Sequence, residues 1–202
     1  MEAEPAEAEA RAAWQRGDHD RATQLALTRY GAEILAFLSA RLRNHGDADD
    51  VFGSFAEKLW HGMPGFRWRS SLRSWCYLIA RNAANDYVTA AHRRRERNLT
   101  LDKHAALSQL VERLRTETAA YRRTEVKDRM QELRESLPPD DQMILILRID
   151  RELSWRELAV ALADGEAPTE DAEISREAAK LRKRFERIKG KLRELAEQDG
   201  LL

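Results

Sequence analysis

The residue types best suited to chemistry in this sequence lie between positions 66 and 97, where aromatic and basic side chains are concentrated. Arg67, Trp68 and Arg69 follow one another in a segment with nearby glycine and proline, and a basic run closes the stretch at residues 93–97. Proteins that hold single-stranded nucleic acid use aromatic faces for base stacking and guanidinium groups for the backbone. A tryptophan often belongs to a core, but the position of Trp68 between two arginines favours a partly exposed stacking residue.

Between the two basic ends, a helical pattern carries polar residues at four-residue steps. Its predicted apolar face contains Trp75 and Ile79. The polar stripe on the opposite face consists of Arg73, Tyr77, Arg81 and Asn85, with Asn82 beside it. Such a stripe is often only a solvated helix surface. Because this one joins basic segments at both ends, we interpret it as part of a continuous nucleic-acid surface.

We find no convincing catalytic or metal-binding combination in the sequence. The five histidines lie far apart and in no zinc-type spacing, and there is no glycine-rich phosphate loop. Asp47, Asp49 and Asp50 resemble a cation site, but no calcium-binding pattern continues from them. They suit the first turn of a helix, where the dipole favours negative charge. We therefore predict no enzymatic activity, no cofactor and no metal.

The composition points to a cytoplasmic protein with long exposed helices. Hydrophobic residues make up 43% of the chain and charged residues 35%. Cys76 is the only cysteine, so no disulfide forms within the chain and a reducing compartment is expected. No apolar run approaches the roughly 18–20 residues that cross a bilayer, so membrane insertion is not expected.

The net charge is zero, but the charges are distributed unevenly. Lys and Arg outnumber Asp and Glu by 9 to 3 in residues 51–98 and by 9 to 5 in residues 175–202. In residues 140–174 the acidic residues dominate by 10 to 3. Two basic blocks indicate two nucleic-acid contacts, and the acidic faces require a different partner. Chance clustering in a chain rich in Arg and Glu is the alternative.

Hydrophobic periodicity predicts helices in the first half of the chain. They cover residues 20–43, 47–60 and 71–87, and a loop is expected at residues 61–71. Asp47 is the expected cap of the second helix. The Glu- and Ala-rich N-terminal residues have nothing to bury, so we expect a frayed tail there.

The second half begins with a weaker pattern. Residues 99–136 show a broken helical stripe with many charges, which predicts a loosely held connector. Two prolines at 138–139 then break the chain, and Asp140 is the expected cap of the following helix. Ser154 and Glu157 form a capping-box pattern before a short helix that ends near Gly165.

The last helix repeats apolar residues at alternating four- and three-residue steps from Ile174 to Leu195. Its opposite face carries Lys180, Arg182, Lys183, Arg184 and Arg187. A coiled coil is one interpretation, but the two short helices before it favour a helix-turn-helix, whose basic face enters a major groove.

No strand pattern competes with these helices. We therefore predict an all-α protein with two small helical domains joined by a partly helical linker. The predicted parts are a disordered tail (1–13), a first domain (14–98), a linker (99–136) and a second domain (137–202).

Several runs resemble the extracytoplasmic-function sigma factors of the sigma-70 family. The runs DADDVFGSFAEKLW (47–60), FRWRSSLRSWCYLIARNAANDYV (66–88) and HRRRER (92–97) are similar to their region 2, a helical bundle. The run LPPDDQMILILRIDRELSWRELAVAL (137–162) and the basic helix after it are similar to their region 4. The resemblance implies a bacterial initiation subunit that binds core RNA polymerase and recognises and opens promoters. It also makes an anti-sigma factor a candidate partner.

The resemblance implies three contact sets. The helix at residues 47–60 would dock on the coiled coil of the largest polymerase subunit through Asp49, Asp50, Phe55, Lys58, Leu59 and Trp60. The loop and helix after it would receive a flipped base and hold the single strand of the minus-ten element, through Arg67, Trp68, Arg69, Arg73, Tyr77, Arg81, Asn82, Asn85, Arg93 and Arg94. The last helix would read the minus-thirty-five element as duplex, beside the polymerase subunit that contacts region 4, through Lys180, Arg182, Lys183, Arg184 and Arg187.

Two features depart from the family pattern. Residues 165–175 insert extra acidic residues into a turn that is short in the family. Either this turn is a longer loop or the last helix begins early, near Thr169. The linker is also longer and more helical than the family leads us to expect. A stand-alone helix-turn-helix regulator and a helical protein-binding adaptor are the alternatives, and the Trp68 loop favours the sigma factor over an ordinary regulator.

Overall fold

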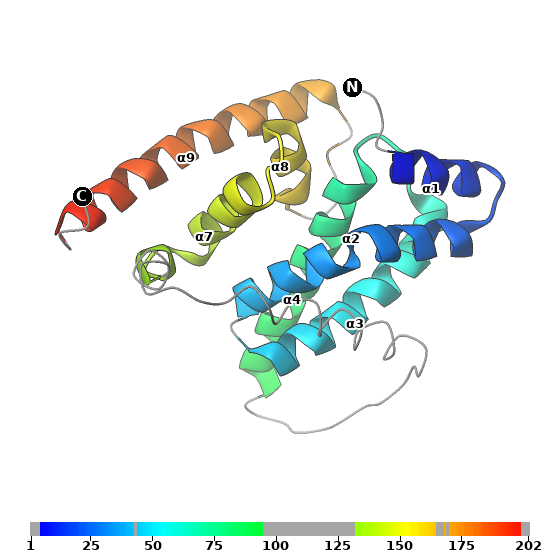
Figure 1. Cartoon of the computed structure of the whole chain (residues 1–202), viewed down its shortest axis with the longest axis horizontal. Helices are drawn as coiled ribbons and strands as arrows, with labels where there is room; N and C mark the ends of the chain where they lie inside the picture. Colours follow the sequence, from blue (N-terminus) through cyan, green and yellow to red (C-terminus); the bar gives the residue numbers. More distant parts are fainter. Residues whose placement is uncertain (1–4, 43, 95–131, 165–167, 169, 199–202) are drawn as a thin grey trace. The chain divides into compact units, whose positions relative to one another are not determined.

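The part of the chain that the structure describes is helical. The structure is a computed structural model, and it describes residues 5–42, 44–94, 132–164, 168 and 170–198. No strand occurs in these ranges, which confirms the predicted all-α class. The chain divides into two units, Met1–Ala120 and Tyr121–Leu202, which are described separately (Figure 1). The division falls inside the predicted linker, and residues 95–131 of that linker lie outside the described ranges.

Unit 1 is a helical bundle centred on its second helix. Its elements are α1 (Pro5–Gln15), α2 (His19–Leu42), α3 (His45–Gly62), the 3-10 turn η1 (Met63–Gly65) and α4 (Leu72–Arg94). Helix α2 packs against α1, α3 and α4, and α3 also packs against α4 (Figure 1). The three helices predicted here are therefore confirmed. Their apolar stripes meet in a core that includes Tyr30, Ile34, Phe37, Leu38, Phe52, Phe55, Leu59, Leu72 and Cys76.

Helix α3 begins earlier than predicted, and Asp47 is not its cap. Asn44 occupies the cap position in an extended conformation, with φ of −134°. Its side-chain oxygen accepts hydrogen bonds from the backbone N–H groups of Gly46 and Asp47, at 2.9 and 3.5 Å. An asparagine carbonyl caps a helix as well as a carboxylate does, so the first available cap sets the start. Asp47 then lies in the first turn, where its charge favours the helix dipole.

The prediction of a disordered tail at residues 1–13 is wrong for the described part of that segment. Residues Pro5–Gln15 form α1, and Ala10 and Ala13 are only 1% and 0% exposed. Alanine has the highest helix propensity, and its small side chain lets α1 approach α2 closely. Gly17, at φ of +79°, ends the helix, and the side chain of Asp18 accepts the N–H of Arg21 at 3.0 Å.

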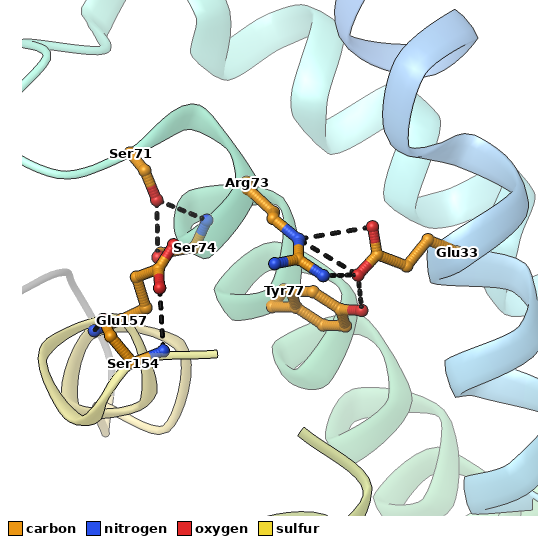
Figure 2. Close-up of polar contacts among 7 residues, drawn as sticks. All are labelled: Glu33, Ser71, Arg73, Ser74, Tyr77, Ser154 and Glu157. Carbon is orange, nitrogen blue, oxygen red and sulfur yellow. Dashed lines mark hydrogen bonds and ion pairs between the residues drawn. The ribbon is translucent and has the colours of Figure 1, made fainter. Parts of the chain in front are cut away.

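Unit 2 is built from shorter helices packed on one long one. Its named elements are α7 (Pro139–Leu145), the π-helical turn η3 (Ile146–Asp150), α8 (Trp155–Ala161) and α9 (Asp171–Gln198). Asp140 is not the cap of α7, because the helix already starts at Pro139 and Asp140 lies in its first turn. The predicted capping box is confirmed: Ser154 Oγ accepts the Glu157 N–H at 3.3 Å, and the Glu157 carboxylate accepts the Ser154 N–H at 2.8 Å (Figure 2).

Helix α9 begins at Asp171, close to the early start near Thr169 that was one of the two predicted alternatives. Ile174 and Ala178 pack against Ala159 and Val160 of α8. The Trp155 and Phe185 rings meet edge to face, with centroids 5.4 Å apart. The apolar seam therefore packs within unit 2, as expected for a helix-turn-helix rather than an isolated coiled coil.

Within the described ranges, we find no helix that is both long enough and apolar enough to cross a membrane.

Candidate nucleic-acid interface

The 66–71 loop presents two exposed arginines on either side of a half-buried tryptophan. Arg67 and Arg69 are exposed, and Trp68 is intermediate, which confirms its predicted partial exposure. Trp68 has φ of +54°, a left-handed conformation that is uncommon for a large side chain. Its indole Nε1 is buried and has no hydrogen-bond partner among the described residues. The loop is therefore held in a conformation that its own residues do not favour.

Two aromatic rings of this loop and two from neighbouring helices form one cluster. The rings follow in the order Trp75, Phe66, Trp68 and Trp14, with centroid separations of 4.4, 5.0 and 6.3 Å. Trp75 and Phe66 are stacked, at an angle of 16°, whereas Trp14 meets Trp68 edge on, at 74°. We call these four residues the aromatic cluster. Trp14 belongs to α1, so a helix predicted as a tail supplies part of the loop's surroundings.

Gly62 allows the cluster to lie close to the end of α3. A Cβ atom added there would be 3.2 Å from Cζ2 of Trp75. That separation is tighter than ordinary van der Waals contact, so a larger residue would push the Trp75 ring and the Phe66 ring stacked on it. The glycine therefore matters for packing around the loop.

The polar stripe of α4 faces α2 rather than solvent. Arg73 donates from Nε to both oxygens of Glu33, at 3.0 and 3.3 Å, and a second guanidinium nitrogen also pairs with that carboxylate (Figure 2). The Tyr77 hydroxyl donates to Glu33 at 2.6 Å, and Tyr77 is only 1% exposed. A half-buried carboxylate needs such donors, which explains why these two side chains turn inward.

The same correction applies further along α4. Asn85 accepts a hydrogen bond from Arg41 of α2 at 2.7 Å. Arg81 and Asn82 are half-buried, and the side chains of Arg93 and Arg94 lie outside the described part of the chain. Trp75 and Ile79, predicted as the core face, are only partly buried. The stripe therefore joins two helices and does not form a single exposed surface.

The six residues predicted to dock on polymerase divide into two groups. Phe55 and Leu59 are 1% and 0% exposed and belong to the bundle core. Trp60 is 42% exposed, and Asp50 and Lys58 are also on the surface. The Lys58 ammonium lies 2.5 Å from Asp86 of α4. Asp49 is intermediate in exposure.

The basic face of α9 is also divided. Arg184 donates to Asp141 of α7 at 2.6 Å, which attaches α9 to α7. The Arg182 guanidinium lies 5.7 Å from the centroid of Trp155, and Lys180 pairs with Glu177 at 2.6 Å. Lys183 and Arg187 are exposed. Arg184 is thus the half-buried cation of this face, whereas Lys180 and Arg182 are exposed although each has a contact within unit 2.

The titratable side chains of the described residues show no metal-binding group, and the one cysteine is buried. Within the described residues, no group of three or more His, Cys, Asp or Glu side chains is arranged to hold a metal. Burial raises the pKa of the Cys76 thiol, and the carboxylates of Glu7 and Glu33 raise it further. A neutral, buried thiol is a poor nucleophile, so Cys76 is a core residue.

Three residues of α1 at the loop escaped the sequence reasoning. Glu7, Arg11 and Trp14 are spaced by four and three residues and so lie on one helix face. The sequence does indicate this helix, through alanines at helical spacing followed by Gly17, which can end a helix, and Asp18, which can cap the next one. Their contacts with the loop come from the tertiary fold and have no sequence signature.

Known proteins resemble this chain in sequence and in fold. Residues 26–95 match the family model for sigma-70 region 2. The chain is 26% identical over 151 residues to the RNA polymerase sigma-H factor of Pseudomonas aeruginosa, covering 73% of this chain and 78% of that protein. The fold of this chain is similar to that of the sigma factor RpoE of Bartonella quintana, which was crystallised with the anti-sigma factor NepR. The TM-score is 0.56 and the identity 19%, over 89% of this chain and 97% of that one.

Proposed function

We propose that this chain, which belongs to the extracytoplasmic-function sigma factors of the sigma-70 family, directs core RNA polymerase to promoters and opens promoter DNA. The observation that carries the proposal is the match of residues 26–95 to sigma-70 region 2, because this span contains both α3 and the 66–71 loop. Its partners are core RNA polymerase and promoter DNA. The chain itself has no enzymatic activity under this proposal, and it acts in the cytoplasm with the polymerase.

Helix α3 is the proposed docking element for the coiled coil of the largest polymerase subunit. The exposed residues Asp50, Lys58 and Trp60 are available for direct contact. An exposed tryptophan is the kind of residue that dominates protein interfaces. Phe55 and Leu59 support the helix from inside the bundle, so their part in docking is indirect.

The 66–71 loop is the proposed element for capturing the minus-ten strand. Arg67 and Arg69 are placed for phosphate contact, and Trp68 supplies an aromatic face for stacking. Flipping a base out of the stack costs a few kcal/mol, which stacking and charge contacts offset. Arg73, Tyr77 and Asn85 support the surface through α2. Direct strand contact by Arg81, Asn82, Arg93 and Arg94 stays a proposal from sequence.

Helix α9 is the proposed reader of the minus-thirty-five duplex. Lys183 and Arg187 are exposed and at four-residue spacing, so both reach the same side of the helix. We assign phosphate or base contact to these two and to Lys180. Arg184 and Arg182 contact Asp141 and Trp155 instead, which supports a structural contribution from them.

The two alternative functions are less well supported. A stand-alone regulator has no need of a region 2 bundle with an arginine-flanked tryptophan loop. An adaptor would use the apolar seam of α9 for a partner, but Ile174, Ala178 and Phe185 are buried within unit 2. An anti-sigma factor is a further proposed partner, because the similar Bartonella protein was crystallised with one.

Run-off transcription tests the proposal directly. Purified chain is added to bacterial core polymerase on a library of genomic fragments, with core alone as the control. We expect discrete promoter-dependent transcripts only when both are present. Absence of transcripts, together with sequence-specific duplex binding by the chain alone, would support the stand-alone regulator instead.

A further inference from the structure

Helix α1 touches the 66–71 loop and its two flanks at three places. The Trp14 Nε1–H donates to the Met63 carbonyl, just before the loop, at 2.8 Å. The Glu7 carboxylate accepts the N–H of Leu72, just after the loop, at 2.7 Å. Between them, the Arg11 guanidinium lies 5.6 Å from the Trp68 ring centroid. One face of one helix therefore reaches the start, the middle and the end of the segment.

These contacts meet specific needs of the segment. The first N–H groups of a helix have no partner within the helix, and Glu7 supplies one for Leu72 at the start of α4. Ser71 supplies another by accepting the Ser74 N–H at 3.1 Å (Figure 2). A carboxylate at a helix N-terminus is also favoured by the dipole. Glu7 thus supplies an acceptor for the first turn of α4, in addition to the one that Ser71 of the loop supplies.

The middle contact addresses the unusual backbone of Trp68. Left-handed backbone conformations in large residues persist only where the surroundings impose them. Trp68 at φ of +54° is enclosed by Phe66, by the edge of Trp14 and by the Arg11 guanidinium. Without α1, two of these three neighbours are lost.

We propose that α1 is the positioning element of the 66–71 loop, and that Glu7, Arg11 and Trp14 are positioning residues for strand capture. The effect on strand capture rests on the proposed function, whereas the effect of α1 on the conformation of the loop does not depend on that function. Loss of the three contacts releases the loop, so Arg67, Trp68 and Arg69 no longer share one conformation. We expect docking through α3 to stay intact, since the three contacts described above reach Met63, Trp68 and Leu72 rather than the exposed side chains assigned to docking.

The first test measures the loop without polymerase. Hydrogen–deuterium exchange is followed in the full-length chain for the wild type, Glu7→Leu, Trp14→Phe and the double variant. Trp14→Phe keeps an aromatic ring, but it removes the N–H donor and part of the ring surface that meets Trp68. We expect exchange of the amides in residues 63–72 to accelerate about tenfold or more in the double variant, because opening equilibria set exchange rates. The amides in the middle of α2 and α3 should keep their protection.

A matched control comes from the same helix. Glu9 is on α1, carries the same charge and makes an exposed ion pair with Arg21 at 3.5 Å. Glu9→Leu should leave exchange in residues 63–72 unchanged, and Glu7→Gln, which keeps an acceptor oxygen, should restore most of the protection. Unchanged loop exchange in the double variant would overturn the proposal. Equal acceleration across all of unit 1 would also overturn it, by showing that α1 stabilises the bundle as a whole.

The second test measures the consequence. Holoenzyme made with each variant is titrated with a fluorescent single-stranded oligonucleotide that carries the non-template minus-ten segment of a promoter found by run-off transcription. We expect about tenfold weaker oligonucleotide binding for the double variant, within the range of one lost base stack. Affinity for core polymerase should stay within about twofold.

The outcomes separate the two proposals. Wild-type holoenzyme that fails to bind the oligonucleotide would count against the proposed function, and the exchange result would still decide the role of α1. Wild-type binding with equal binding by the double variant would overturn the positioning role. A parallel loss of core binding would overturn it as well.

Discussion

Among the described residues, the 66–71 loop of unit 1 and helix α9 of unit 2 both carry exposed basic side chains, and the two segments are held in different ways. Helix α9 is positioned by contacts along its own length, through Ile174 and Ala178 on α8 and Arg184 on α7. The loop is positioned by a helix about fifty residues earlier in the chain, since Trp14 and Met63 are 49 residues apart. A helix surface follows from its own periodicity, whereas an irregular loop depends on what surrounds it.

In both units, predicted DNA-binding cations are used in internal ion pairs, but these pairs differ in their exposure to water. In unit 1, Arg73 and Glu33 have side chains only 25% and 16% exposed. In unit 2, the Arg184 side chain is 40% exposed and that of Asp141 is 18% exposed. Removing one partner of an ion pair lowers the unfolding free energy more when the pair is shielded from water. Substitutions of Glu33 and of Asp141 therefore compare the two pairs directly.

The largest expected effect is therefore on Glu33. Glu33→Gln leaves the Arg73 charge half-buried beside a weaker acceptor and should lower the unfolding free energy of unit 1 by about 2–3 kcal/mol. Asp141→Asn should cost less than about 1 kcal/mol in unit 2, because water reaches Arg184. Urea unfolding followed by hydrogen exchange in α4 and α9 measures both. Equal losses would contradict the difference between the two pairs.

The next largest expected effect is on promoter opening and comes from Trp68→Ala. Loss of one base–aromatic stack is worth about 1–3 kcal/mol, so promoter opening should fall by about five- to 150-fold. Core polymerase binding should not change. Trp60→Ala on α3 is the matched control. This substitution should weaken core polymerase binding as its primary defect, whereas Trp68→Ala should primarily impair promoter opening. If Trp68→Ala weakens core binding as much as opening, the assigned division between loop and α3 is wrong.

The cations of α9 should separate by their contacts. Lys183→Ala and Arg187→Ala should each lower the salt slope of duplex binding by about one unit per lost phosphate contact. Arg184→Ala should leave the slope unchanged, although it loosens α9 from α7. Fluorescence anisotropy across a series of salt concentrations measures the slopes. An equal change for Arg184→Ala would show that this residue reaches DNA despite its pair with Asp141.

The smallest effect concerns Cys76, which belongs to unit 1 alone. Because the folded state raises the thiol pKa, the native thiolate is scarce and alkylation at pH 8 should be negligible until the protein is unfolded. The same shift makes the contribution of Cys76 to stability constant below its ordinary pKa of 9.0, and this contribution falls as the pH rises above that value. Mass spectrometry after iodoacetamide treatment, with a urea-unfolded control, checks this. Rapid alkylation of the native chain would indicate that unit 1 opens readily.

Much of the fold follows from local pattern. The helices of the first half, the Ser154–Glu157 capping box and the apolar seam of α9 were all predictable, because each depends on residues within a few positions of one another. The caps at Asp47 and Asp140 were wrong because another residue a few positions earlier starts the helix. Helix α1 was missed because alanine faces give little hydrophobic signal even when they are fully buried.

The site was less predictable than the fold. Residue types predicted a stacking role for Trp68 and a charge role for its two neighbouring arginines. They did not identify which arginines and aromatics elsewhere are used internally, because Arg73, Tyr77 and Arg184 look the same in sequence whether they meet DNA or a carboxylate. Those choices depend on Glu33 and Asp141, which lie 40 residues or more away along the chain.

The helical class, the position of the tryptophan loop and the resemblance to sigma-70 region 2 all follow from the sequence alone. These depend on periodicity and on motif order, which survive without knowledge of packing. Which polar side chains face solvent, and which helix contacts the loop, depend on the tertiary structure. The physical reason is that burial and pairing are properties of segments brought together, and the contacts of Glu7, Arg11 and Trp14 with residues 63–72 exist only once α1 packs beside the loop.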